Sequence, residues 1–212
     1  MNAKTSGTKT GSPGGALPIV CIGMSAGGLK ALQRVFQQLS PKTGMAFVIV
    51  HHLRHYPTHL PEILSHCTAM PVELVTGGLL VQPDHVYILP SGKDITVADG
   101  FFAVRPRSKL LGFSNVATVF LDSLSKSRHP GVAVILSGIG GNGAAALKNF
   151  TGKGGIAIVQ EPALAERPDM PLAAIETGCV SHVLAPGAIA AELEKLAARF
   201  KGAPISVQMG GA

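Results

Sequence analysis

A serine, Ser25, lies at the centre of the pentapeptide 23–27, which reads Gly-Met-Ser-Ala-Gly. The apolar residues 19–22 before it indicate a short buried strand, and apolar residues at helical spacing over 29–39 indicate a helix after it. A G-x-S-x-G turn between a strand and a helix lifts the serine hydroxyl clear of the backbone, because small neighbours allow a sharp bend. The pattern therefore predicts a nucleophilic serine. Free N–H groups at the start of the helix would favour an oxyanion beside it.

Two other polar segments follow predicted strands. The apolar strand 45–50 runs into His51 and His52, and the apolar strand 132–136 runs into the glycine-rich segment 137–143, which contains Asn142. In open parallel sheets, ligands bind outside the carboxyl ends of the strands. We therefore expect one site formed by Ser25, His52 and the segment 138–143.

Each of these residues also has an ordinary structural interpretation. Ser25 could cap the helix that follows it, and His51 and His52 could be partly exposed loop histidines. Asn142 is expected to be the N-cap of a helix at 144–150, whatever else it does.

The segment 138–143 also reads G-x-G-x-x-G between a strand and a helix, with Glu161 after the next strand, near the distance expected of a ribose-binding acid. This pattern favours a dinucleotide-binding oxidoreductase domain as an alternative. Against it, the turn after the first strand has Ser25 where the second glycine of that fingerprint would stand.

A metal site is a weaker alternative. His51, His55 and His59 are spaced by four, as on one face of a helix, but Pro57 interrupts that helix. Because no nearby carboxylate or cysteine completes a ligand set, no metal site is predicted.

The elements that must position these residues alternate between strands and helices. The expected strands span 19–22, 45–50, 72–76, 81–90, 95–97, 101–105, 132–136, 155–159 and 180–184. The expected helices span 29–39, 60–67, 116–125, 144–150, 172–177 and 189–200. The proline-containing region 72–90 is expected near a sheet edge. Uniformly apolar strands are typical of parallel sheets covered on both faces, so we expect an α/β fold: a doubly wound, mostly parallel sheet with helices on both faces and a small β-hairpin addition.

The composition limits the class of protein. The 212 residues are 46% hydrophobic, which suits one domain at 18–202 between flexible tails at 1–17 and 203–212. The formal charge of +6 is spread without a basic stripe, so nucleic-acid binding is not expected. The three scattered cysteines, and the lack of a membrane-length apolar run or secretory signal, indicate a cytoplasmic protein without membrane insertion.

Four motifs, taken in this order, resemble the catalytic domain of the chemotaxis receptor methylesterases, the CheB family. Residues 22–28 match I-G-x-S-x-G-G. Residues 50–53, Val-His-His-Leu, correspond to V-Q-H-M or V-Q-H-L, and residues 136–143, Leu-Ser-Gly-Ile-Gly-Gly-Asn-Gly, correspond to L-[ST]-G-x-G-x-D-G. Residues 170–171 match the start of M-P-R. The resemblance is nearest to domains fused to a receptor methyltransferase.

The resemblance implies hydrolysis of glutamate methyl esters on the cytoplasmic domain of a methylated chemoreceptor. It implies Ser25 as the nucleophile, His52 as the general base and no cofactor. The remaining site residues that it implies are Met170 on the substrate side and an oxyanion loop of Ala26, Gly27, Gly140 and Gly141.

Three departures from the family pattern bear on the expected activity. Asn142 stands where the family has the aspartate that orients the histidine, Ala117 stands where it usually has an aspartate, and Leu172 replaces the arginine of M-P-R. Because an amide cannot stabilise an imidazolium, the resemblance predicts weakened hydrolysis. An alternative is a catalytically impaired module of the same fold that binds a receptor or another partner. Family members often carry a receiver domain, so a separate receiver or methyltransferase protein is a predicted partner.

Overall fold

The computed structural model describes residues 16–51, 59–108 and 115–202. Seven strands form one sheet in the order β3-β4-β2-β1-β7-β8-β9, and every neighbouring pair is parallel. These strands are β1 (Ile19–Met24), β2 (Ala46–His51), β3 (Val72–Leu74), β4 (His85–Ile88), β7 (Gly131–Ile135), β8 (Ile156–Gln160) and β9 (His182–Leu184). A separate antiparallel hairpin consists of β5 (Lys93–Ala98) and β6 (Phe101–Pro106). The predicted α/β fold with a parallel sheet and a hairpin addition is confirmed.

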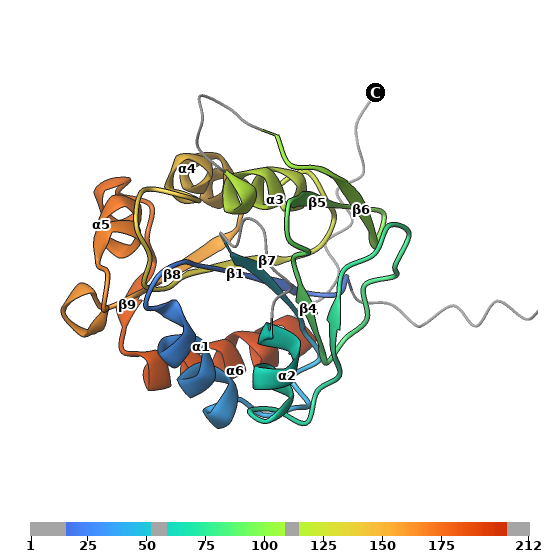
Figure 1. Cartoon of the computed structure of the whole chain (residues 1–212), viewed down its shortest axis with the longest axis horizontal. Coiled ribbons are helices and arrows are strands. Elements are labelled where there is room, and N and C mark those ends of the chain that lie inside the picture. Colours follow the sequence, from blue (N-terminus) through green and yellow to red (C-terminus); the bar gives the residue numbers. More distant parts are fainter. Residues whose placement is uncertain (1–15, 52–58, 109–114, 203–212) are drawn as a thin grey trace, which may run out of the picture.

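Helices cover both faces of the sheet (Figure 1). One face is covered by α1 (Gly28–Gln38), α2 (Leu60–Ser65) and α6 (Pro186–Gly202). The other is covered by α3 (Val116–Leu124), α4 (Ala144–Gly152), α5 (Asp169–Glu176) and the hairpin.

The central strand β1 illustrates why the strands are apolar throughout. Ile19 and Cys21 pack into the core on the α3 side, whereas Val20 and Ile22 pack into the core on the α1 side. Successive side chains of a strand point to opposite faces, so a strand covered on both faces carries no polar positions.

The region 72–90 is only partly an edge. β3 is the edge strand, as expected, but β4 pairs with both β3 and β2. Pro83 and Pro90 lie outside the bounds of β4. Because proline has no N–H to donate to a strand ladder, the strand is confined to residues between the two prolines.

The helix expected at 172–177 begins earlier, at Asp169, so that Met170 and Pro171 lie in its first turn. The first N–H groups of a helix have no partner within the helix, and a proline is therefore tolerated there. The preceding segment contains the 3-10 helix η1 (Pro162–Leu164).

The turn of the hairpin is the predicted two-residue turn. Asp99 and Gly100 have φ of 50° and 82°, the left-handed values that such a turn requires. In the described part of the chain, no helix has both the length and the apolar character needed to cross a membrane. Most of the two predicted tails lies outside the described residues, and Leu17, which was assigned to the first tail, packs against the core.

Candidate active site

Ser25 and the glycine-rich segment 137–143 meet where the strand order reverses. β1 lies between β2 and β7. Strands β2 to β4 are on one side of β1 in the sheet, and strands β7 to β9 are on the other side. Ser25 directly follows β1, and its N–H donates to the Ser137 carbonyl oxygen at 3.0 Å. Ligands of open α/β sheets bind at such a switch point, outside the carboxyl ends of the strands.

The turn that carries Ser25 is built on a left-handed glycine. Gly27 has φ +75°, and the Gly28 N–H donates to the Ser25 carbonyl oxygen at 3.1 Å. Gly27 is the N-cap of α1 and no side chain caps this helix, so the alternative in which Ser25 caps it is wrong. Among the described residues, the N–H groups of Ala26 and Gly27 donate no backbone hydrogen bond, which leaves them available to an acceptor.

Residues just before α5 and in its first turn form hydrogen bonds with the glycine-rich segment. Gly138 donates its N–H to the Arg167 carbonyl oxygen at 3.0 Å, and its own carbonyl oxygen accepts the Met170 N–H at 3.0 Å. A methyl group on Gly138 would overlap the Met170 sulfur and would lie 2.9 Å from the Ser25 Cβ. Met170 therefore lies beside Gly138 with its side chain buried at 1% exposure, and its place on the substrate side stays a prediction.

Gly140 and Gly141 form the exposed outer part of this segment. Gly140 has φ +83°, and no atom within 4 Å would meet a methyl group placed on it. Neither residue donates a backbone N–H hydrogen bond within the described part of the chain. Their exposure leaves both N–H groups open to a ligand at the edge of the sheet.

Asn142 is nearly enclosed, at 7% exposure, and its Oδ1 is fully buried without a hydrogen-bond partner among the described residues. The N-cap of α4 is Gly143, and no side chain caps the helix, so the predicted capping role of Asn142 is wrong. Buried acceptors are nearly always hydrogen-bonded in proteins, and an unpaired one costs about 1–3 kcal/mol. Asn142 Oδ1 is therefore the atom of this site that most needs a donor.

Residues in the N-terminal part of α3 contact the same segment at Gly143. The Thr118 hydroxyl oxygen accepts the Gly143 N–H at 3.3 Å. A methyl group on Gly143 would lie 3.3 Å from the Ala117 Cβ, and Ala117 is completely buried. The side chain at position 117 is thus packed against the glycine-rich segment within the core.

His52, the predicted general base, lies outside the described residues. Its neighbour His51 is the last residue of β2 and is buried, at 2% exposure, so the interpretation of His51 as a loop histidine is wrong. In the parallel register of β1 and β2, His51 is opposite Met24, which directly precedes Ser25.

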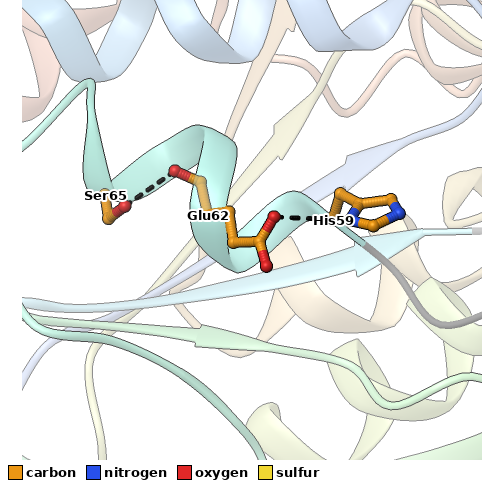
Figure 2. Close-up of polar contacts among 3 residues, drawn as sticks. All are labelled: His59, Glu62 and Ser65. Carbon is orange, nitrogen blue, oxygen red and sulfur yellow. Dashed lines mark hydrogen bonds and ion pairs between the residues drawn. The ribbon is translucent and has the colours of Figure 1, made fainter.

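The described histidines do not form a metal site. His59 is exposed, its Nδ1 lies 3.3 Å from Glu62 Oε2, and Ser65 donates to the Glu62 carbonyl oxygen at 2.7 Å within α2 (Figure 2). Within the described ranges no three His, Cys, Asp or Glu side chains are grouped as metal ligands. His55 lies outside those ranges.

The cysteines offer no competing nucleophile at this edge. Cys21 is buried in β1, and burial raises the pKa of its thiol, which suppresses the reactive thiolate. Cys67 and Cys179 are half-buried and have free thiols.

Two buried polar residues at the site, Ser137 and Gln160, were missed by the sequence analysis. The Ser137 carbonyl oxygen accepts the Ser25 N–H, and the Ser137 N–H donates to Gln160 Oε1 at 2.9 Å. The available signal was a polar residue at the end of each of two otherwise apolar segments, 132–137 and 156–160.

Comparisons with known proteins give consistent results. Residues 20–193 match the family model described as CheB methylesterase. A protein-glutamate methylesterase/protein-glutamine glutaminase of Hahella chejuensis is 30% identical over 181 residues, covering 84% of this chain and 52% of that protein. The protein-glutamate methylesterase FrzG of Myxococcus xanthus is 31% identical over 179 residues, covering 83% and 54%. The chain spans about half the length of these two relatives.

The fold is also similar to a solved structure. The crystal structure of the Thermotoga maritima CheB methylesterase catalytic domain superposes with a TM-score of 0.75 at 25% sequence identity. The match covers 86% of this chain and 99% of that one.

Proposed function

Because the chain belongs to the CheB methylesterase family, we propose that it hydrolyses glutamate methyl esters on the cytoplasmic domain of a methylated chemoreceptor, and therefore acts in the cytoplasm. Relatives over this region are named protein-glutamate methylesterases. The position of Ser25 at the switch point of the sheet supports the same chemistry here.

The observation that carries the proposal is the buried, unpaired Oδ1 of Asn142. An imidazole that donates one ring N–H to this oxygen keeps a lone pair on its other nitrogen, which is the form that a general base requires. The β1–β2 register supports His52 as the source of that imidazole, because His51 lies opposite Met24.

In the proposed reaction, the Ser25 hydroxyl attacks the ester carbonyl carbon while His52 takes its proton. The negative charge on the carbonyl oxygen is stabilised by free N–H groups, for which the candidates are Ala26, Gly27, Gly140 and Gly141. The methoxy group then takes the proton from His52 and leaves as methanol. Water hydrolyses the resulting acyl-enzyme by the same route and restores Ser25.

Asn142 sets the expected rate. Its amide accepts a hydrogen bond from the neutral ring but has no charge with which to stabilise the imidazolium formed during attack. The proposed activity is therefore weaker than that of an enzyme with an aspartate at this position.

The glycine-rich segment does not decide the dinucleotide alternative. Gly138, its first glycine, has its N–H bonded to the Arg167 carbonyl oxygen, and Met170 lies against it. Gly140, the second glycine, at which such a site brings the backbone close to a pyrophosphate, is exposed and donates no backbone hydrogen bond among the described residues. The family match favours the esterase over this alternative. The binding-module alternative has the same geometry as the enzyme and differs from it in turnover alone. A receiver or methyltransferase partner stays a prediction.

Methanol release tests the proposal. We expect the purified protein, incubated with a methylated receptor cytoplasmic fragment, to release methanol slowly, and the Asn142→Asp variant to release it faster. Ser25→Ala should abolish release in both backgrounds. A protein that binds the methylated fragment and releases no methanol even as Asn142→Asp would establish the binding module instead.

A further inference from the structure

Ser137 connects three segments of the site through its own polar groups. Its carbonyl oxygen accepts the Ser25 N–H at 3.0 Å. Its hydroxyl has two acceptors within reach, the Ala26 carbonyl oxygen at 3.0 Å and the Arg167 carbonyl oxygen at 3.3 Å, and the nearer one is on the nucleophile turn. The same hydroxyl oxygen accepts the Arg167 N–H at 2.9 Å. Ser137 is completely buried, so no solvent competes for these bonds.

Gln160 holds Ser137 from the next strand. Its Oε1 accepts the Ser137 N–H at 2.9 Å, and its Nε2 donates to the Leu164 carbonyl oxygen at 2.9 Å. Gln160 is the last residue of β8 and is buried. The Gln160 side chain therefore links the residue after the end of β7 to the end of η1 by two hydrogen bonds.

The two bonds from Ser137 to the nucleophile turn act on the peptide group before Ser25 and on the peptide group after Ala26. The N–H of Ser25 belongs to the peptide group before it, and the Ala26 carbonyl belongs to the peptide group that ends in the Gly27 N–H. No cis peptide is found among the described residues, and a trans peptide points its C=O and N–H in opposite directions. Because Ser137 holds the Ala26 C=O inward, the Gly27 N–H is directed outward.

The turn has little other room in which to move. A methyl group on Gly27 would lie 2.8 Å from the Ser137 hydroxyl oxygen and 2.5 Å from the Glu166 Cβ. The segment that carries Glu166 is itself held by the bond from the Arg167 N–H to Ser137. The turn is thus enclosed between two elements that meet at one hydroxyl group.

From these contacts we propose that Ser137, supported by Gln160, is a positioning residue that sets the direction of the Ser25 hydroxyl and of the Gly27 N–H. It does not contact substrate and acts through the turn. The inference rests on the proposed function in its choice of Ser25 as nucleophile, but it does not depend on which ester is the substrate.

The test compares Ser137→Ala with a matched buried hydroxyl at the other end of the strands. Thr43 is also buried, accepts the Met45 N–H at 3.1 Å and donates to Asp84 at 3.3 Å. The two readouts are the rate at which a fluorophosphonate labels Ser25, which needs no receptor, and the kcat and KM for methanol release.

We expect Ser137→Ala to lower both the labelling rate and kcat by about 10-fold or more with little change in KM, because a misdirected oxyanion donor weakens transition-state binding. Ser137→Thr should restore most of the rate, since it keeps the hydroxyl. Thr43→Val should lower the melting temperature and leave the labelling rate unchanged. Gln160→Met, which removes the support and keeps Ser137, should lower the rate less than Ser137→Ala and carries the test if that variant does not fold.

A labelling rate within about twofold of wild type in Ser137→Ala or, where that variant does not fold, in Gln160→Met would overturn the positioning role. An equal loss in Thr43→Val would overturn it as well, because the effect would then be one of stability alone. If the wild type is labelled at Ser25 but releases no methanol, the proposed function fails and the labelling rates still decide the positioning role. If the wild type is not labelled at all, both proposals fail.

Discussion

The two ends of the parallel strands carry similar residues in different arrangements. At the amino ends of β2 and β4, Asp84 Oδ1 accepts the Gly44 N–H at 2.6 Å and the Thr43 hydroxyl at 3.3 Å. The Met45 N–H donates to the Thr43 hydroxyl oxygen at 3.1 Å, and the Asp84 N–H donates to the Met45 carbonyl oxygen at 2.7 Å. Each of these donors has an acceptor, and the cluster is closed.

The carboxyl ends use a hydroxyl, a left-handed glycine and an amide to build an open cluster. Ser137 is fully bonded. Among the described residues, in contrast, Asn142 Oδ1 has no hydrogen-bond partner, and the N–H groups of Ala26 and Gly27 donate no backbone hydrogen bond. Of these groups Asn142 Oδ1 is the buried one, and an unpaired buried acceptor costs stability, whereas Ala26 is exposed. This difference is the one expected if the amino ends stabilise the sheet and the carboxyl ends form the proposed active site.

The largest expected effect separates these two roles directly. Ser25→Ala should lower methanol release to background, a loss on the order of 10⁴-fold or more where the wild-type signal permits. It should change the free energy of unfolding by less than about 0.5 kcal/mol. Thr43→Val should do the reverse, costing about 1–3 kcal/mol in urea unfolding without changing turnover. Turnover that survives in Ser25→Ala would refute the assignment of the nucleophile.

The next contrast changes an amide to an acid at the carboxyl ends of the strands and an acid to an amide at their amino ends. Asn142→Asp should raise turnover, by about 10-fold if only the hydrogen bond to the ring gains a charge and by up to about 10⁴-fold if the effect equals that in a serine protease. The measurement is kcat for methanol release.

Asp84→Asn is the mirror variant at the amino ends. It weakens the short bond from the Gly44 N–H and should cost about 1 kcal/mol of unfolding free energy while kcat stays at the wild-type value. Equal effects of the two variants on kcat would remove the distinction between the ends.

Two glycines with nearly the same backbone conformation provide a smaller contrast. Gly27 has φ +75° and Gly44 has φ +76°, so a methyl group strains both by about 1–2 kcal/mol. At Gly27 it would also overlap Glu166 and Ser137, whereas at Gly44 it would meet only the end of the Lys201 side chain. Gly27→Ala should therefore cost about 2–4 kcal/mol and abolish turnover. Gly44→Ala should cost only the strain and leave turnover intact, as thermal unfolding and methanol release would reveal.

The smallest expected effect concerns the reactivity of a cysteine thiol in β1, the strand that runs from the amino end of the sheet to Ser25. Burial raises the pKa of Cys21 in β1, so this thiol should resist iodoacetamide at pH 8 in the native protein, while Cys67 and Cys179 react slowly. In urea all three should react. Mass spectrometry of the labelled peptides measures this, and rapid native labelling of Cys21 would mean that β1 opens locally and that the site is not rigidly held.

Local patterns in the sequence predicted most of the elements. Uniformly apolar runs predicted the central strands, helical spacing predicted α1, and Asp99-Gly100 predicted the hairpin turn. These features depend on the burial and conformational preferences of neighbouring residues, which a single stretch of chain contains. The N-terminus of α5 was misplaced because Pro171 indicates an end to a helix, whereas its first turn tolerates a proline.

The site was predicted less completely, because its contacts join residues far apart in the chain. The motif around Ser25 was evident from five residues, but the burial of His51 depends on the neighbours of β2 in the sheet, namely β4 and β1. Asn142 has a residue type that often caps helices and lies just before α4. The N-cap of α4 is nevertheless Gly143, so Asn142 does not cap the helix.

The sequence by itself determined the strand–helix alternation and the sharp turn that presents Ser25, because spacing and residue size act locally. The tertiary structure alone decided that β7 pairs with β1, which brings Ser137 beneath Ser25 and joins it to Gln160. Strand order is settled by how distant apolar surfaces pack together, and no short stretch of sequence specifies it.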